Sequence, residues 1–493
     1  MWKHASILIL AILLGLSANC QKTLSVAQVD KESFALFQKG QWEQLILEGE
    51  KANKQGIDFY YLQYRMAIAY YELKKYRKAA SLFHKLYLLN GEDAIIKEYL
   101  YFSYLLGGQE KDAIQLQNKL AQSTSEKYGI GKTKVISSIY SEVKNELLDD
   151  YAITSDLLQE QTVRKDFLHY SIGLNHQLGE RVSLFHAFSH VDVKNSIVSE
   201  TYLFDEDITQ NQYYLKSSIQ VGTGTELVIA GHIMQTKIDG NPQTDILTTA
   251  LSQQTTFTKA GGNGNGPGGG GDGGNGPGGG TDGSGDGNSD GTGTGNETGN
   301  GNDPTNTDTA DTEIILSPYH FSQNNFIAYL GLTQDISNWK LGAGVLYYSG
   351  DDLTRWQQEL KLTFYPLGNT NINLSVGFNN QIEETTDGNS LNRSYWKTAI
   401  AFRIAKNTWA SAGYTFGDLY KQVENQGYSV FNGVNLVKNR KEFSIYQYLF
   451  KGKLNVFLIY QNQNEKNNYT INDVINSQNI NVQSITGGIK WNF

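Results

Sequence analysis

From about Lys132 to the C-terminus, apolar and polar residues alternate in short runs, and this alternation restricts the fold more than any other feature of the sequence. The clearest run is the last one, NVQSITGGIKWNF, from Asn481 to Phe493. Successive side chains of a β-strand point to opposite faces, so this run has one apolar face with an aromatic end and one polar face. The pattern predicts that the C-terminal two-thirds of the chain is built from strands.

Fourteen such runs can be counted, and their connections are alternately short and long. A transmembrane barrel shows this alternation because its turns are tight on one side of the membrane and its loops are long on the other. We therefore predict a closed antiparallel barrel over residues 131–493, with both ends on the short-turn side. The count is open between 12 and 16 strands, because residues 428–437 fit either a strand or a loop. The runs lie near residues 134–144, 166–178, 182–194, 211–222, 226–238, 323–336, 341–349, 355–365, 370–382, 394–405, 408–418, 441–450, 454–464 and 481–493.

A barrel in hydrocarbon must satisfy every backbone polar group internally, present an apolar outer face and keep its polar side chains in the lumen. This rule predicts which charged side chains point inward. One interpretation is a selective channel lining, and the other is a network of paired charges that fills a narrow barrel. The predicted lumen residues are Lys216, Glu359, Lys361, Lys397, Arg403 and Lys490.

Residues 25–127 have a helical period and an internal repeat of 34 residues, in which Leu45, Ala79 and Ala113 correspond. The middle copy resembles a tetratricopeptide repeat, with small and aromatic residues at Ala67, Tyr70, Tyr76, Ala79 and Phe83. The resemblance implies pairs of antiparallel helices that stack into a solenoid over residues 21–130. The fold class is thus α+β and multidomain, a helical solenoid followed by a transmembrane barrel of about 14 strands.

Stacked helical repeats commonly bind a peptide or protein on their concave face. Candidate groove residues are Tyr64, Arg65, Tyr71 and Lys75. The alternative is that these side chains only pack the stack.

The N-terminal residues 1–20 are typical of a secretory signal peptide, with Lys3 before an apolar run and small residues at its end. Cleavage after Cys20 leaves no cysteine in the mature chain, whereas acylation of Cys20 is the alternative. A net charge of −9 without a basic run gives no indication of nucleic-acid binding. Because no nucleotide loop, thiol centre or HExxH motif is present, we do not expect an enzyme.

A glycine-, aspartate- and asparagine-rich tract at 259–313 interrupts one of the long loops and is predicted to be a disordered extracellular insert. Part of it resembles an EF-hand loop, with oxygen-bearing side chains at Asp286, Asn288, Asp290 and Glu297. The match implies weak Ca²⁺ binding, although tracts of this composition also produce it by chance and no flanking helices are predicted. We expect no other cofactor.

The final strand, with Trp491 and Phe493 at its end, resembles the C-terminal signal that the barrel assembly machinery reads in outer-membrane barrels. The whole architecture resembles surface lipoprotein assembly modifiers and, more distantly, exopolysaccharide export porins. These resemblances imply a bacterial outer-membrane protein in contact with lipid, with its repeats in the periplasm. They imply export, surface assembly or an envelope complex, with a protein or polysaccharide client. A passive or structural pore docked to envelope machinery and a surface adhesin are the alternatives.

Overall fold

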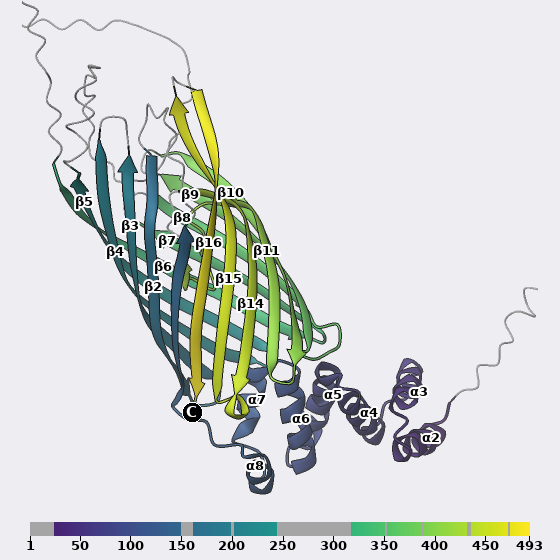
Figure 1. The fold of residues 1–493 in the computed structure, drawn as a ribbon. Helices are drawn as coiled ribbons and strands as arrows, with labels where there is room; N and C mark the ends of the chain where they lie inside the picture. Colours follow the sequence, from purple (N-terminus) through teal and green to yellow (C-terminus); the bar gives the residue numbers. More distant parts are fainter. Residues whose placement is uncertain are drawn as a thin grey trace, which may run out of the picture.

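The computed structural model describes residues 24–148, 161–198, 202–243, 317–350, 353–385, 388–430, 435–471 and 474–493. In these ranges the chain forms N-terminal helices followed by a closed antiparallel barrel of 14 strands (Figure 1). The predicted fold class, helices followed by such a barrel, is confirmed. The predicted signal peptide and the glycine-rich tract, including its four candidate Ca²⁺ ligands, lie outside the described residues.

The helices repeat at a constant interval. Helices α2, α4 and α6 begin at Val26, Tyr60 and Ala94, and α3, α5 and α7 begin at Trp42, Tyr76 and Glu110, so that each set is spaced by 34 residues. The resemblance to tetratricopeptide repeats stays a prediction. The full bounds are α2 (Val26–Gln38), α3 (Trp42–Lys54), α4 (Tyr60–Glu72), α5 (Tyr76–Leu89), α6 (Ala94–Leu106), α7 (Glu110–Gln117) and α8 (Gln122–Tyr128).

Small buried residues let neighbouring helices approach closely. Ala79 and Ala113 are almost fully buried in one core cluster, together with Phe83. The turn inside each helix pair needs one left-handed residue, and Gly40 and Gly108 supply it with φ of 64° and 75°. In the middle pair the same place is taken by Lys74, with φ of 59°.

Each barrel strand pairs with the next along the chain, and β1 closes on β16 with Ile139 opposite Trp491. The strands are β1 (Ile136–Leu148), β2 (Gln161–Leu178), β3 (Val182–Val198), β4 (Leu203–Gly222), β5 (Thr225–Pro242), β6 (Tyr319–Ile336), β7 (Trp339–Ser349), β8 (Leu353–Phe364), β9 (Ile372–Thr385), β10 (Ser390–Ala405), β11 (Thr408–Leu419), β14 (Leu436–Leu449), β15 (Leu454–Ile471) and β16 (Val474–Asn492). The helices lie at the end of the barrel where the short turns are, which we call the short-turn end (Figure 1).

The outer face of the barrel is apolar and the inner face is polar. On β16, Ile485, Ile489 and Trp491 are exposed on the outside, whereas Thr486 is buried on the inside. The other strands follow the same rule, as expected of a sheet that closes in hydrocarbon. No described helix is both long and apolar enough to cross a membrane.

Several segments that the sequence indicates as long loops are strand instead. Residues 196–210 are an example, because β3 continues to Val198 and β4 already begins at Leu203. β4 has 20 residues, about twice what is needed to cross a bilayer as a tilted strand. The extra length lies in water, where neither face must be apolar, so the alternation that identifies strands is lost.

Candidate functional site

Residues 420–430 of the connection between β11 and β14 fold into the lumen. The sequence runs near 408–418 and 441–450 predict a long outside loop over residues 419–440, and the described part of this segment corrects that prediction. It contains a two-stranded hairpin of β12 (Val423–Glu424) and β13 (Ser429–Val430). We call residues 420–430 the lumen hairpin. The sequence leaves residues 428–437 open between strand and loop. In the described part of this segment only Ser429–Val430 and the start of β14 at Leu436 are strand.

The tip of the lumen hairpin contacts several parts of the barrel wall. The Tyr214 hydroxyl donates to the Gln426 carbonyl at 3.0 Å, and His232 Nδ1 donates to the Gly427 carbonyl at 2.8 Å. The Tyr428 hydroxyl lies 2.8 Å from Ser171 Oγ on another strand. The contacts involve β2, β4 and β5 at positions well inside each strand, so the tip lies deep in the lumen.

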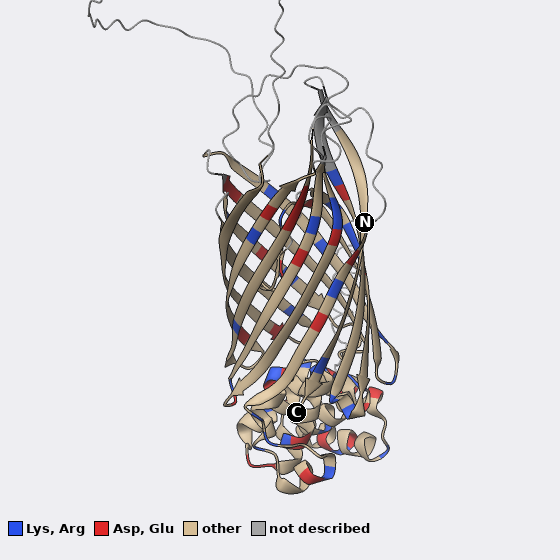
Figure 2. Ribbon diagram, turned by 60° about the vertical axis from the view of Figure 1, so that its left-hand side comes forward, with Lys and Arg blue, Asp and Glu red and all other residues tan. Residues whose placement is uncertain are grey.

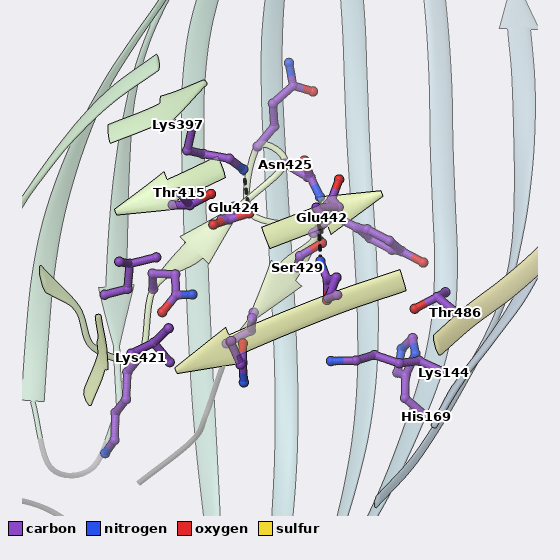
Figure 3. A pocket seen from close by; sticks show the side chains of 18 of the residues that line it. Lys144, His169, Lys397, Thr415, Lys421, Glu424, Asn425, Ser429, Glu442 and Thr486 are labelled. Carbon is purple, nitrogen blue, oxygen red and sulfur yellow. Dashed lines mark hydrogen bonds and ion pairs between the residues drawn. The ribbon is translucent and has the colours of Figure 1, made fainter. Parts of the chain in front are cut away.

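Buried ion pairs fix the base of the lumen hairpin. Glu424 accepts from Arg440 at 2.8 Å. It also accepts from Lys397 at 2.6 Å (Figure 3). The Arg440 side chain is 1% exposed, and Glu424 provides a buried carboxylate against its charge. Arg355 pairs with Glu383 at 2.6 Å and also donates to the Lys421 carbonyl.

A cavity of about 890 Å³ runs beside the lumen hairpin. Its lining comes from both halves of the barrel, for example from Glu146 and Arg164 toward the long loops and from Lys361 and Gly377 toward the short turns. Figure 3 shows Lys144 and His169 across the cavity from Lys397 and Glu424. The lumen is therefore obstructed by the hairpin but is not packed solid.

Helix α5 is fixed to the short-turn end by Arg77, whose side chain is 1% exposed. The guanidinium forms an ion pair with Asp335 and donates to the carbonyls of Ser337 at 2.5 Å and Trp339 at 3.0 Å. It also stacks over the Tyr365 ring at 4.3 Å. One side chain from the helices thus binds three acceptors at the β6–β7 turn.

Helix α7 makes a second attachment through Asp112. This carboxylate accepts from the Gly224 backbone N–H at 3.0 Å and from Gln220 Nε2 at 2.8 Å. Burial raises the pKa of Asp112 to about 6, and the two hydrogen bonds oppose that shift. Further contacts from Lys119 to Glu180 and from Lys74 to Asn369 extend the attachment to the β2–β3 and β8–β9 turns.

The six predicted lumen residues differ in where they lie. Four of them, Lys216, Glu359, Lys361 and Lys397, line the cavity. Lys490 is half-buried on the inward phase of β16. Arg403 is exposed at the short-turn rim, where it stacks over Trp409 and bonds to the Ala405 carbonyl.

The four predicted groove residues do not form one surface. Arg65 is buried between α2 and α4, paired with Asp30 at 2.7 Å and bonded to Ser33 Oγ at 2.9 Å. Tyr64 and Tyr71 pack against the helical core. Lys75 is exposed next to Gly368 of the barrel, so it belongs to the attachment between helices and barrel.

Sequence reasoning missed the lumen hairpin, Arg77 and Asp112. The partner of Arg77 is 258 residues away, and an arginine in the first turn of a surface helix carries no mark of burial. A signal for the hairpin existed in Glu424 and Arg440, two opposite charges separated by a turn-forming stretch, but such pairs are common in exposed loops.

No family model and no curated protein matches this chain. Solved structures with a similar fold include the toluene transporter TodX of Pseudomonas putida, at 9% identity and a TM-score of 0.41, covering 73% of this chain and 91% of that one. A Pseudomonas aeruginosa FadL homologue has 9% identity and a TM-score of 0.37, covering 73% and 89%. CdiB from Acinetobacter baumannii has 9% identity and a TM-score of 0.33, covering 73% and 61%. These are remote similarities, and the functional argument below uses the residues of this chain.

Proposed function

We propose that this protein is a transport barrel of the bacterial outer membrane that a periplasmic protein partner opens. The apolar outer face and the polar lumen support the membrane location. The observation that carries the proposal is the lumen hairpin, a segment of the chain itself that obstructs a cavity lined by both halves of the barrel. In this proposal the client passes through the lumen, and Trp491 and Phe493 direct the barrel to the assembly machinery.

The helices serve as the docking module for the partner. Helices α2 to α4 extend sideways from the base of the barrel (Figure 1). They expose Phe34 and Tyr61, which are 46% and 63% accessible, on either side of the Arg65 guanidinium. Aromatic residues and arginine are the side chains that dominate protein interfaces, so this aromatic pair is the proposed partner-binding surface.

The docking role is tested on the full-length protein in its membrane. A photo-crosslinking residue at position 61 is expected to capture one periplasmic protein, and the additional change Phe34→Ala should reduce that capture at least tenfold. The matched control places the same residue at Tyr128, which is also exposed but lies on α8. Equal capture at both positions, or none at position 61, would contradict the proposed surface.

The transport role is tested by conductance in planar bilayers. The intact protein is expected to be closed for most of the recording, and replacing residues 421–430 with a short glycine-serine linker should give a steady open pore. A steady large conductance of the intact protein would instead favour a passive pore. No conductance in the hairpin-deleted protein would argue against any transport path through the lumen.

A further inference from the structure

Below the lumen hairpin the barrel contains a concentration of lysine side chains that the proposed gating does not use. We call the space between the hairpin tip and helix α7 the lower chamber. Its wall is formed by the short-turn halves of the strands, and Figure 2 shows the charged positions along these strands and in the helices beneath them. The lysines involved are Lys111, Lys216, Lys340, Lys361 and Lys490.

These ammonium groups lie close enough to act on one another. Lys216 experiences the charges of Lys111 and Lys490, and Lys111 also experiences that of Lys340. Lys361 experiences those of Lys340 and Lys397. Three carboxylates, Glu110, Glu226 and Glu359, act on the same groups, and Tyr329 bonds to Glu359 at 2.5 Å. Asp335 is shared between Arg77 and Lys340, so the lysines outnumber the carboxylates and the lower chamber is positive.

Two of these lysines, Lys216 and Lys361, line the cavity beside the lumen hairpin. Lys216 is directed by Gln426 of the hairpin at 3.3 Å, and Lys111 reaches into the barrel to bond Ser183 of β3. Lys361 is accessible and lines the cavity, and its register partners on β7 and β9 are Gly342 and Gly377, which leave room beside it. Within the described residues, Lys361 and Lys490 form no ion pair with a carboxylate.

Clustered lysines in a low-dielectric wall attract anions and repel cations. Resting on the proposed transport function, we propose that the lower chamber binds and selects small anionic solutes that carry phosphate or carboxylate groups. Because Lys111 belongs to α7, the helical region supplies part of the selectivity site as well as the docking surface. Lysine is suited to this role, since its ammonium is a mobile point charge that binds phosphate without requiring one fixed geometry.

The first test is ion selectivity of the hairpin-deleted pore, measured as the reversal potential in a KCl gradient. We expect chloride to be preferred over potassium by roughly fivefold or more, and the double change Lys216→Glu and Lys361→Glu to reverse the preference. The matched control is Lys165→Glu, which removes an exposed lysine paired with Asp205 and should leave the reversal potential unchanged. A conducting pore without anion preference would overturn the inference.

The second test needs no conductance. Inorganic pyrophosphate is titrated into the full-length protein in detergent, with binding followed by calorimetry. The intact protein should bind, and Lys216→Gln combined with Lys490→Gln should weaken binding at least tenfold, whereas Lys165→Gln should not. If the hairpin-deleted protein fails to conduct, the transport function fails, and this titration alone decides the anion site. Absence of pyrophosphate binding, or equal loss in the control, would overturn it.

Discussion

Replacing Arg77 with methionine is expected to release the helices from the barrel without unfolding either. The substitution keeps most of the apolar stem but removes the guanidinium, which leaves the Asp335 carboxylate and the Ser337 and Trp339 carbonyls without their donor. Breaking a buried ion pair by removing one partner costs about 3–5 kcal/mol. Lys340 lies 4.0 Å from Asp335 and offsets part of this loss, so we expect a shift of about 3 kcal/mol, or roughly 100-fold in the docking equilibrium.

Hydrogen exchange of backbone amides, read by mass spectrometry in detergent, measures this equilibrium directly. The Gly224 N–H is bonded to Asp112 of α7 and becomes free only when the helices leave the rim. Its exchange should accelerate roughly 100-fold in the Arg77→Met protein if opening is by undocking. Amides in the middle of β4 should keep their protection, because the barrel itself is unchanged.

The matched control is Arg65→Met, which also removes a buried arginine from the helices. Arg65 pairs with Asp30 inside the helical region, and in the described part of the chain its hydrogen bonds go to Asp30 and Ser33 of α2. It should loosen α2 against α4 and leave exchange at Gly224 as it is in the parent protein. The reasoning is refuted if Gly224 accelerates less than about threefold in Arg77→Met, or if both variants accelerate it equally.

Three further predictions concern the hairpin, the pH dependence of docking and barrel assembly. Glu424→Gln should raise the open-state probability in planar bilayers at least tenfold, because it removes the carboxylate that pairs with both Arg440 and Lys397 at the base of the lumen hairpin, and Lys165→Gln should not. Asp112 has a pKa of about 6 when docked and an ordinary value of 3.8, so the docked state binds the proton more tightly. Docking of the helices should therefore strengthen as pH falls from 6 to 4, by up to about tenfold per pH unit. Asp112→Asn should abolish this contribution to the pH dependence of Gly224 exchange. An unchanged pH dependence in that variant would contradict the role given to Asp112. Deleting Phe493 should lower the amount of heat-modifiable folded barrel in membranes severalfold, and normal assembly would argue against a role in the assembly signal.

The barrel was predictable from sequence to the extent that the membrane imposes a pattern on it. Where a strand crosses hydrocarbon, every second side chain must be apolar, and so the runs that end in Ile485 or Leu330 were recognisable. Above that layer both faces meet water, and residues such as Asp205 and Glu206 lie in β4 although they read as loop. The number of strands follows from the residues that cross hydrocarbon, and the length of each strand depends also on the residues above that layer. For this reason the sequence predicts the number of strands but not where they end.

The site was less predictable, because its components meet only in the folded chain. Lys216 and Lys361 could be assigned to the lumen from alternation alone, since facing inward is a local property of a strand. Their common chamber with Lys111 could not, because it depends on where α7 docks. The lumen hairpin likewise has the composition of an exposed loop, and its position follows from acceptors and donors such as His232 that belong to distant strands.

Strand β8 connects the two closures of the lumen physically. Near the short-turn end it is followed by the turn where the Gly368 carbonyl accepts from the Arg77 backbone N–H at 2.9 Å. Toward the other end it carries Arg355, which donates to the Lys421 carbonyl, and Gln357, which donates to the Val423 carbonyl at 2.7 Å. A β-strand paired on both sides resists bending, and we propose that a displacement of α5 at the rim is passed to the base of the hairpin through this one continuous element. A partner that pulls on the helices therefore acts on the same strand that holds the hairpin in place, and this gives the proposed opening a route that needs no contact between the partner and the lumen.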